Sequence, residues 1–174
     1  MGDFTHRVTD TMLRSEFLPV RARMRIMRWI GYDIHPSACI WSGAILRSKK
    51  LHLGPHAFIN IGFFFDGHDH LEIAENVRIG QFVRVLTATH EIGPPDQRCL
   101  VGVRSGPVSI SKGCWICSSV TILPNINVAE GCVIAAGAVV TRTTTPNGLY
   151  AGVPARLVRL LNGHATTTNI SQPC

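Results

Sequence analysis

The feature that most constrains this chain is an apolar residue that recurs at every sixth position in its C-terminal half. The uninterrupted series consists of Ile110, Ile116, Ile122, Val128, Ile134 and Val140. A small or apolar residue lies four positions after each of the first five, at Cys114, Val120, Ile126, Cys132 and Ala138. Upstream, the same spacing continues in blocks that include Ile34, Leu53 and Ile73, and a long segment from Glu91 to Ser109 interrupts it.

This period predicts a three-sided solenoid and fits neither an α-helix nor a flat sheet. A period of about 3.6 residues would not keep the same phase over so long a stretch, and a lone strand alternates with a period of two. Each hexapeptide therefore forms one short strand and a corner, with its apolar residue pointing inward. Stacked coils then hydrogen-bond to one another. Short hairpins in a sandwich or barrel are the alternative, which six consecutive matches disfavour.

The repeat divides the chain into a helical cap at residues 1–33, a β-helix at 34–150 with an insertion at 91–109, and a C-terminal segment at 151–174. In the cap, two helices are expected at Val8–Phe17 and Arg21–Ile30. The second mixes apolar residues with four arginines. It is expected to pack on the first coil, and contact with a membrane surface is the other interpretation. A short helix is expected from Pro154 to Leu161, followed by a loosely ordered tail.

Composition narrows the classes of partner and compartment. The chain carries 17 Lys and Arg against 11 Asp and Glu, a formal net charge of +6 that favours anionic partners. It has no aromatic cluster of the kind that binds RNA, so no nucleic-acid partner is expected. No apolar run approaches the roughly 20 residues that span a bilayer. We expect a cytoplasmic protein whose six cysteines are reduced, with Cys114 and Cys132 stacked one coil apart in the core.

Four motifs, in this order, resemble those of a known family. They are the segments 87–90 (Thr-Ala-Thr-His), 106–110 leading into Trp115-Ile116, 137–141 and 151–156 (Ala-Gly-Val-Pro-Ala-Arg). The chain resembles the hexapeptide-repeat acyltransferases of the maltose, galactoside and nodulation-factor O-acetyltransferase group. Its N-terminal segment is more similar to that of bacterial surface-polysaccharide acetyltransferases. The resemblance implies a left-handed parallel β-helix, a homotrimer and active sites between neighbouring subunits, with acetyl-CoA lying along the coils.

The resemblance also assigns residues. His90 matches the catalytic general base, and Asn60 matches an asparagine that contacts the acceptor sugar. His68 falls where the galactoside enzyme has an acceptor-binding aspartate, so this chain departs from the pattern there. The positions that match contacts to the cofactor are Trp115, Ser118, Ala136, Thr141, Arg142, Arg156 and Arg159.

The chemistry that follows is acetyl transfer to a hydroxyl group of a saccharide, in the assembly of a polysaccharide or lipopolysaccharide. A hydroxyl is a poor nucleophile at neutral pH, and a histidine with a pKa of about 6.5 is suited to take its proton. Arg142, Arg156 and Arg159 would contact the phosphates of the donor. The insertion is expected to be a partly mobile loop over the acceptor site.

Three other functions remain open from the sequence. A metal enzyme resembling γ-class carbonic anhydrase would place His68, His70 and His90 on a zinc ion, although no resident metal is expected. A catalytically silent β-helix would organise an assembly and bind no CoA. The third variant keeps the acetyl transfer but changes the acceptor to an antibiotic or an amino sugar.

Overall fold

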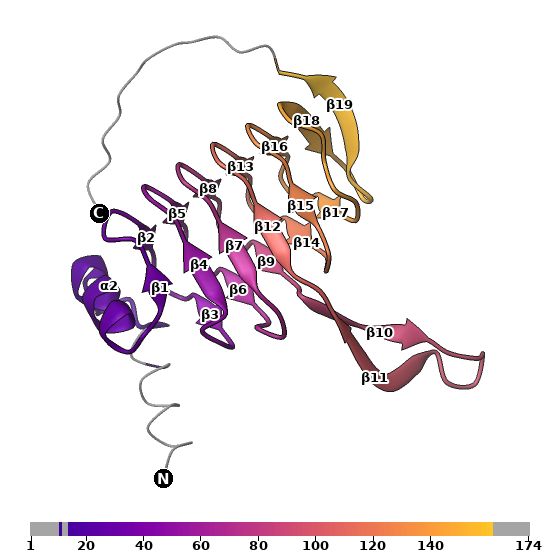
Figure 1. Cartoon of the computed structure of the whole chain (residues 1–174), viewed down its shortest axis with the longest axis horizontal. Coiled ribbons are helices and arrows are strands. Elements are labelled where there is room, and N and C mark those ends of the chain that lie inside the picture. The colour runs from indigo at the N-terminus through magenta and orange to yellow at the C-terminus, as the bar shows by residue number, and fades with distance from the viewer. Residues whose placement is uncertain (1–10, 12–13, 162–174) are drawn as a thin grey trace.

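The computed structural model describes residue 11 and residues 14–161. Over this range, short parallel strands stack into a three-sided β-helix, with helix α2 (Val20–Trp29) at its N-terminal end (Figure 1). The predicted solenoid is therefore confirmed. Within the same range, no helix has the length and apolar character needed to cross a membrane.

Three sheets form the sides of the β-helix, and successive strands visit them in turn. The first sheet consists of β1 (Asp33–Ile34), β4 (Leu51–Leu53), β7 (Leu71–Ile73), β12 (Val108–Ile110) and β15 (Asn127–Val128). The second consists of β2 (Cys39–Ile40), β5 (Phe58–Ile59), β8 (Arg78–Ile79), β13 (Trp115–Ile116), β16 (Val133–Ile134), β18 (Gly148–Ala151) and β19 (Arg156–Leu160). The third consists of β3 (Ile45–Leu46), β6 (Phe64–Phe65), β9 (Arg84–Val85), β14 (Thr121–Ile122) and β17 (Val139–Val140).

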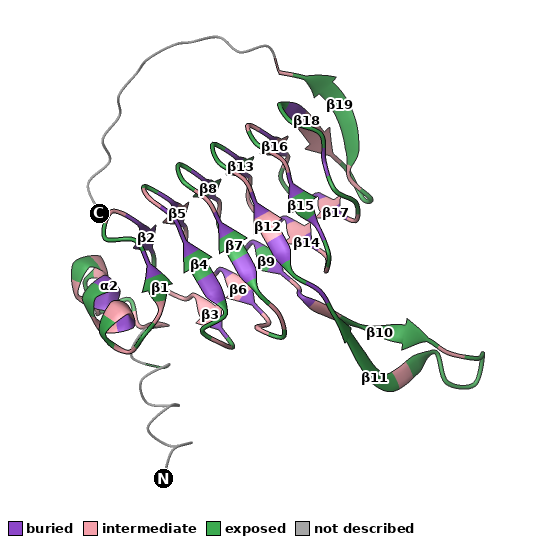
Figure 2. Ribbon diagram, viewed as in Figure 1, coloured by how far each residue is buried: buried purple, intermediate pink, exposed green. Residues whose placement is uncertain are grey.

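The residues at the six-residue spacing form the core. Each lies opposite its counterpart in the next coil, as Ile59 does opposite Ile79 and Ile116 opposite Ile134. All six members of the uninterrupted series are at most 1% exposed. Figure 2 shows buried residues on the strands of successive coils. Burial of one such side chain contributes about 1.5–3 kcal/mol, so the period in the sequence is the main source of the fold's stability.

Helix α2 packs on the first coil, as expected for the cap. Its buried residues Met24 and Met27 belong to the same apolar core as Ile34 of β1. Its bounds agree with the predicted helix at residues 21–30 to within one residue. Half of the other predicted helix, Val8–Phe17, lies outside the described residues; Thr11 and Arg14 are helical, and residues 15–17 are not.

The insertion is a β-hairpin, and its prediction as a loop is wrong. Strand β10 (Ala88–Ile92) pairs antiparallel with β11 (Cys99–Ser105). Once the chain leaves the coil, its backbone groups lose their neighbours in the stack, and pairing within the hairpin satisfies them. We call this hairpin the arm. It leaves the solenoid at the corner between the third and first sheets and extends away from it (Figure 1).

The C-terminal segment is a strand, and the predicted helix from Pro154 to Leu161 is wrong. Strand β19 pairs antiparallel with β18, with Leu157 opposite Tyr150 and Arg159 opposite Leu149. The last coil otherwise leaves the edge of β18 open, and an unpaired edge is unfavourable, so pairing overrides the weak local helix signals. The tail from His164 onward lies outside the described residues.

Candidate functional site

An open groove of about 510 Å³ runs across the outer face of the second sheet and its corner with the third. Three predicted site residues, Asn60, Trp115 and Ser118, lie together in its wall. The remaining lining residues are Phe58, Arg78, Ile79, Gly80, Gln81 and Cys117. The chain thus brings the predicted acceptor residue Asn60 next to two predicted cofactor residues. We call this hollow the second-sheet groove.

The second-sheet groove combines aromatic surface with polar groups. Trp115 is 56% exposed, and the Arg78 guanidinium carbon lies 5.5 Å from the centroid of the Phe58 ring. The Ser118 hydroxyl donates a hydrogen bond of 2.7 Å to Oε1 of Gln81. Sequence reasoning missed Phe58, Arg78 and Gln81. The outward positions of strands β5 and β8, in register with Trp115, were the available signal.

His90 lies on β10 of the arm, and carbonyl groups of the partner strand β11 hold its ring. Its Nδ1 lies 2.9 Å from the carbonyl oxygen of Leu100 and 3.2 Å from that of Gly102. A carbonyl oxygen only accepts hydrogen bonds, so Nδ1 carries the proton of the neutral ring. The lone pair is therefore on Nε2 of an exposed imidazole. This tautomer and exposure suit a general base.

Asp66 fastens the first residues of the arm to the preceding coil. Its carboxylate accepts hydrogen bonds from the backbone N–H of Thr87 at 2.9 Å and of Ala88 at 3.1 Å. The fully buried Thr87 also donates its hydroxyl to Asp66 and accepts the N–H of Asp69 at 3.0 Å. Sequence reasoning missed Asp66, because the contact joins residues 21 and 22 positions apart.

The other predicted residues are divided among separate parts of the β-helix. His68, Thr141 and Arg142 follow strands of the third sheet, as the arm with His90 does. Ala136 is exposed at the opposite corner, beyond β16. Arg156 and Arg159 are exposed on β19. A single chain therefore places its predicted site residues on the second sheet and on the two corners that flank the third sheet.

The described histidines and cysteines form no metal centre within one chain. Among the described residues, no group of three or more His, Cys, Asp and Glu side chains is arranged to hold a metal ion. Cys114 and Cys132 are buried in the core, as predicted. Burial raises the pKa of Cys114 from 9.0 to about 12 and also raises the pKa of Cys117. Both thiols stay protonated near neutral pH, which disfavours metal binding and redox chemistry at these positions.

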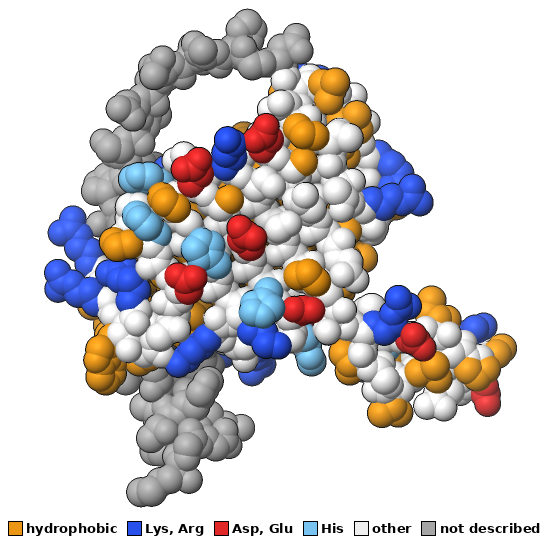
Figure 3. All heavy atoms as spheres, viewed as in Figure 1, with side chains coloured by type: hydrophobic (Ala, Val, Ile, Leu, Met, Phe, Trp, Pro, Cys, Tyr) orange, Lys and Arg blue, Asp and Glu red, His pale blue; other side chains and the backbone are white. Residues whose placement is uncertain are grey.

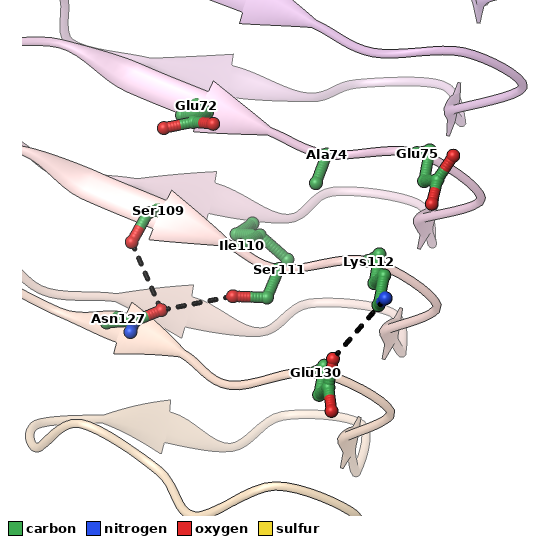
Figure 4. A pocket seen from close by; sticks show the side chains of 9 residues that line it. All are labelled: Glu72, Ala74, Glu75, Ser109, Ile110, Ser111, Lys112, Asn127 and Glu130. Carbon is green, nitrogen blue, oxygen red and sulfur yellow. Dashed lines mark hydrogen bonds and ion pairs between the residues drawn. The ribbon is translucent and has the colours of Figure 1, made fainter.

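A second hollow, of about 410 Å³, lies on the first sheet and is polar (Figure 4). Oδ1 of Asn127 accepts hydrogen bonds from the Ser109 and Ser111 hydroxyls at 3.1 and 3.3 Å. Lys112 Nζ lies 3.8 Å from a carboxylate oxygen of Glu130. None of the predicted site residues lines this hollow. The second-sheet groove is therefore the stronger candidate for a binding site.

Comparisons with known proteins find relatives of similar sequence and fold. The chain is 30% identical to the galactoside O-acetyltransferase of Escherichia coli K12 over 114 residues, which are 66% of this chain and 56% of that protein. The structure of a maltose O-acetyltransferase from Clostridium difficile 630 superposes with a TM-score of 0.80 at 25% identity, covering 92% of this chain and 86% of the other. In both sequence and fold, the chain is similar to the hexapeptide-repeat acyltransferases.

The fold has further counterparts in the hexapeptide-repeat acyltransferase family. A hexapeptide-repeat acetyltransferase from Vibrio cholerae O1 biovar eltor, solved with acetyl-CoA, has a TM-score of 0.73 at 22% identity, covering 90% of this chain and 87% of that one. The chain spans about half the length of the curated relatives it matches, 53% and 56% of the first two. No protein-family model matches the sequence.

Proposed function

We propose that the protein is an acetyl-CoA-dependent O-acetyltransferase that modifies a hydroxyl group of a saccharide, with His90 as general base. The observation that carries this proposal is the state of the His90 ring. The carbonyl groups of Leu100 and Gly102 fix the proton on Nδ1 and leave Nε2 as an exposed acceptor. Relatives that are named galactoside and maltose O-acetyltransferases support both the reaction and the saccharide class.

The reaction is a direct transfer. Nε2 of His90 removes the proton from the acceptor hydroxyl as its oxygen attacks the thioester carbonyl carbon. The tetrahedral intermediate then collapses, the carbon–sulfur bond breaks, and the CoA thiolate takes the proton back from the imidazolium. The products are an acetyl ester and free CoA. A base in this position contributes roughly 10²–10⁴ in rate.

The second-sheet groove is the proposed site of the donor. The exposed face of Trp115 would lie beside the pantetheine arm, with Ser118 and Ala136 along the same corner. Arg142, Arg156 and Arg159 would meet the phosphates, which guanidinium groups bind through paired hydrogen bonds. Asn60 and His68 would contact the acceptor. Asn60 shares the groove with Trp115, so the acceptor would bind near the reactive end of the donor.

We infer that the working enzyme is a homotrimer whose active sites lie between subunits. Within one chain, the arm with His90 and the second-sheet groove are at different corners, separated by the third sheet. The arm also leaves three apolar side chains exposed, Ile92 at 84%, Val101 at 86% and Val103 at 52%. An arm seated on a neighbouring subunit would cover them and bring His90 to that subunit's groove.

The acceptor is proposed to be a building block of a polysaccharide or lipopolysaccharide. Acetyl-CoA is available in the cytoplasm, which is therefore the proposed compartment. The acceptor side of the site departs from the galactoside enzyme at His68, so the accepted sugar is expected to differ from galactosides. Asn60 and the imidazole of His68 offer hydrogen-bonding groups that suit hydroxyl-rich ligands.

The test is thiol release from acetyl-CoA in the presence of a panel of monosaccharides, amino sugars, aminoglycosides and glycan fragments. His90→Ala is compared with His35→Ala. His35 is also exposed and its Nδ1 is also held, by the Ser37 hydroxyl at 2.8 Å, but it lies outside the proposed site. Acceptor-dependent release should fall at least 100-fold in His90→Ala and stay within twofold in His35→Ala.

Three outcomes contradict the proposal in different ways. Normal turnover by a folded, trimeric His90→Ala variant would show that His90 is not the general base. Release that requires an amine rather than a hydroxyl would change the acceptor class. No binding of CoA in calorimetry, together with no release, would leave a silent scaffold or a metal enzyme, which metal analysis then separates.

A further inference from the structure

The outward side of the N-terminal cap carries a regular series of aromatic and basic residues. Phe17, Arg21, Arg25 and Trp29 follow one another at intervals of four, the spacing that places residues on one side of a helix. Phe17 precedes α2 and is 99% exposed, and Trp29 ends it and is 86% exposed. Arg21 and Arg25 are exposed between them. The helical spacing applies to Arg21, Arg25 and Trp29 of α2, whereas Phe17 lies in the turn before the helix. We call these four residues the cap stripe.

The cap stripe is separate from the side of α2 that packs against the core. The opposite side of α2 packs on the solenoid through Arg23, Met24 and Met27, which are all buried. Lys49 of the first coil donates a hydrogen bond to the carbonyl oxygen of Ile30, directly after the helix. The helix is thus fixed with its apolar side inward. Phe17 and Trp29 stay exposed on the outward side, where they are available for a contact outside the chain.

The charge of the whole chain is concentrated at this end. Residues 11–50 contain eight Lys and Arg against two Asp and Glu, an excess of six that equals the formal net charge of the full sequence. The two acidic residues are Glu16 and Asp33, and Asp33 lies 2.7 Å from Nδ1 of His52. Figure 3 shows Lys and Arg side chains gathered over the end formed by α2 and the first coil. The remainder of the chain is balanced in charge.

We propose that the cap stripe docks the protein on an anionic lipid bilayer. Aromatic side chains such as Trp and Phe favour the region between headgroups and acyl chains, and arginines bind lipid phosphates. A positive segment gains about fivefold in membrane affinity for each Lys or Arg near an anionic surface. A cap stripe lying among the headgroups would make a peripheral and reversible contact.

The geometry of the assembly would strengthen this contact, and this step alone depends on the trimer proposed above. Subunits related by a three-fold axis along parallel solenoids present their three caps at the same end. Three weak contacts to one surface add up to a much tighter one. A single cap would bind weakly, so the trimer would act as one unit toward the membrane. An enzyme held there would meet lipid-linked saccharides.

The test is co-sedimentation of the full-length protein with vesicles. Vesicles that contain 30% phosphatidylglycerol in phosphatidylcholine are compared with pure phosphatidylcholine, at about 0.05 M and 0.5 M NaCl. Bound protein is expected only on the anionic vesicles and only at low salt. Arg21→Glu/Arg25→Glu should lower the partition coefficient at least 25-fold. The matched control Lys112→Glu changes an exposed cation in the turn after β12 and should lower the partition coefficient less than threefold.

The aromatic part of the cap stripe has its own readout. Adding anionic vesicles should shift the tryptophan emission of the protein to shorter wavelength, and Trp29→Ala should abolish this shift although Trp41 and Trp115 remain. Acetyl transfer to a soluble acceptor should be unchanged in all these variants, because none lies in the proposed active site. Failure of the membrane contact is thus separable from failure of the enzymatic proposal.

Several results would overturn the proposal. Absence of binding to anionic vesicles at low salt would do so directly. Equal loss of vesicle binding in the Arg21→Glu/Arg25→Glu and Lys112→Glu variants would show that binding depends on the net charge of the protein and not on the cap stripe. Binding to RNA or to a purified protein partner, without vesicle binding and abolished by the cap substitutions, would assign the cap stripe to that partner instead.

Discussion

Asp66 is the residue that positions the strand carrying His90. Its two carboxylate oxygens accept two backbone N–H groups and the Thr87 hydroxyl, all at the point where the chain leaves the coil. His90 follows three residues after Thr87. Without this attachment, the base of β10 would be held only by its pairing with β11. Asp66 therefore acts on the reaction through the placement of His90 and does not itself touch the substrate.

Replacing Asp66 by Asn should lower kcat and stability together. An amide has only one accepting oxygen, so a buried donor at residues 87–88 is left unpaired, which costs about 1–3 kcal/mol of unfolding free energy. A shift of the imidazole by 1 Å is enough for a loss of roughly 100-fold, and we expect kcat to fall about 10- to 100-fold. Steady-state kinetics and urea unfolding measure the two effects.

A positioning role for Asp66 can be distinguished from a purely structural one by the kinetic parameters that stay unchanged. The KM for acetyl-CoA should stay within about twofold of its original value, and the pH profile of kcat should keep its shape because His90 remains the base. Glu72→Gln, an exposed carboxylate on the first sheet, serves as the control and should change neither parameter. Unchanged kcat in a destabilised Asp66→Asn would refute the positioning role.

Cys114 makes stability depend on alkaline pH. Burial raises its pKa from 9.0 to about 12, so the folded state keeps the thiol protonated while the unfolded chain begins to lose the proton near pH 9. Its contribution to stability is therefore complete below pH 9 and is lost as pH rises toward 12. Over pH 9–11, unfolding free energy should fall more steeply for the original protein than for Cys114→Ser, measured by urea denaturation. Cys99→Ser, at an exposed thiol, should follow the original curve.

At the scale of elements, the coils were predictable and the two hairpins were not. Each coil position is set by burial alone. The local six-residue period therefore predicts that residues such as Ile116 and Ile134 point into the core. The arm and β19 are set by backbone pairing instead, which depends on where another strand ends. Residues 156–160 carry weak signals for both helix and strand, and only the open edge of β18 decides between them. The contact of Asp66 with Thr87 is equally invisible, because it crosses an entire coil.

The arm offers a test of the proposed assembly. Val101 is 86% exposed at the outer part of β11 and would be covered in the trimer, so Val101→Asp should weaken association. Placing a charge in an apolar contact costs several kcal/mol, which converts to a rise of at least 100-fold in the dissociation constant. Sedimentation velocity at micromolar protein measures it. Gln97→Asp, which adds the same charge at the tip of the arm, should leave the association state unchanged. A stable trimer with Val101→Asp would exclude the arm from the interface.

In the whole molecule, the stability of each coil depends on the coils stacked directly against it. Each coil contacts only the coil above and the coil below it, so an end coil is held from one side unless something covers the other. Helix α2 covers the first coil, and β19 covers the edge of the last. Local disruption of a cap should therefore loosen the coil next to it and leave distant coils unaffected. Most globular domains, by contrast, share one core in which such damage spreads.

Substitution of Arg23 tests whether disruption of the N-terminal cap has only a local effect. It is 2% exposed, and its guanidinium donates to the carbonyl oxygens of Ser15 and Leu18 at 2.7 and 2.9 Å, tying the segment before α2 to the helix. Arg23→Ala removes a charged donor, and each such bond is worth about 1.5–3 kcal/mol. Hydrogen exchange should accelerate at least 10-fold in α2 and in β1–β3, and should stay unchanged in β15–β17, four coils away. The exposed Arg25→Ala should change neither region. Uniform acceleration along the chain would mean that the β-helix opens as one cooperative unit and that its cap has no local role.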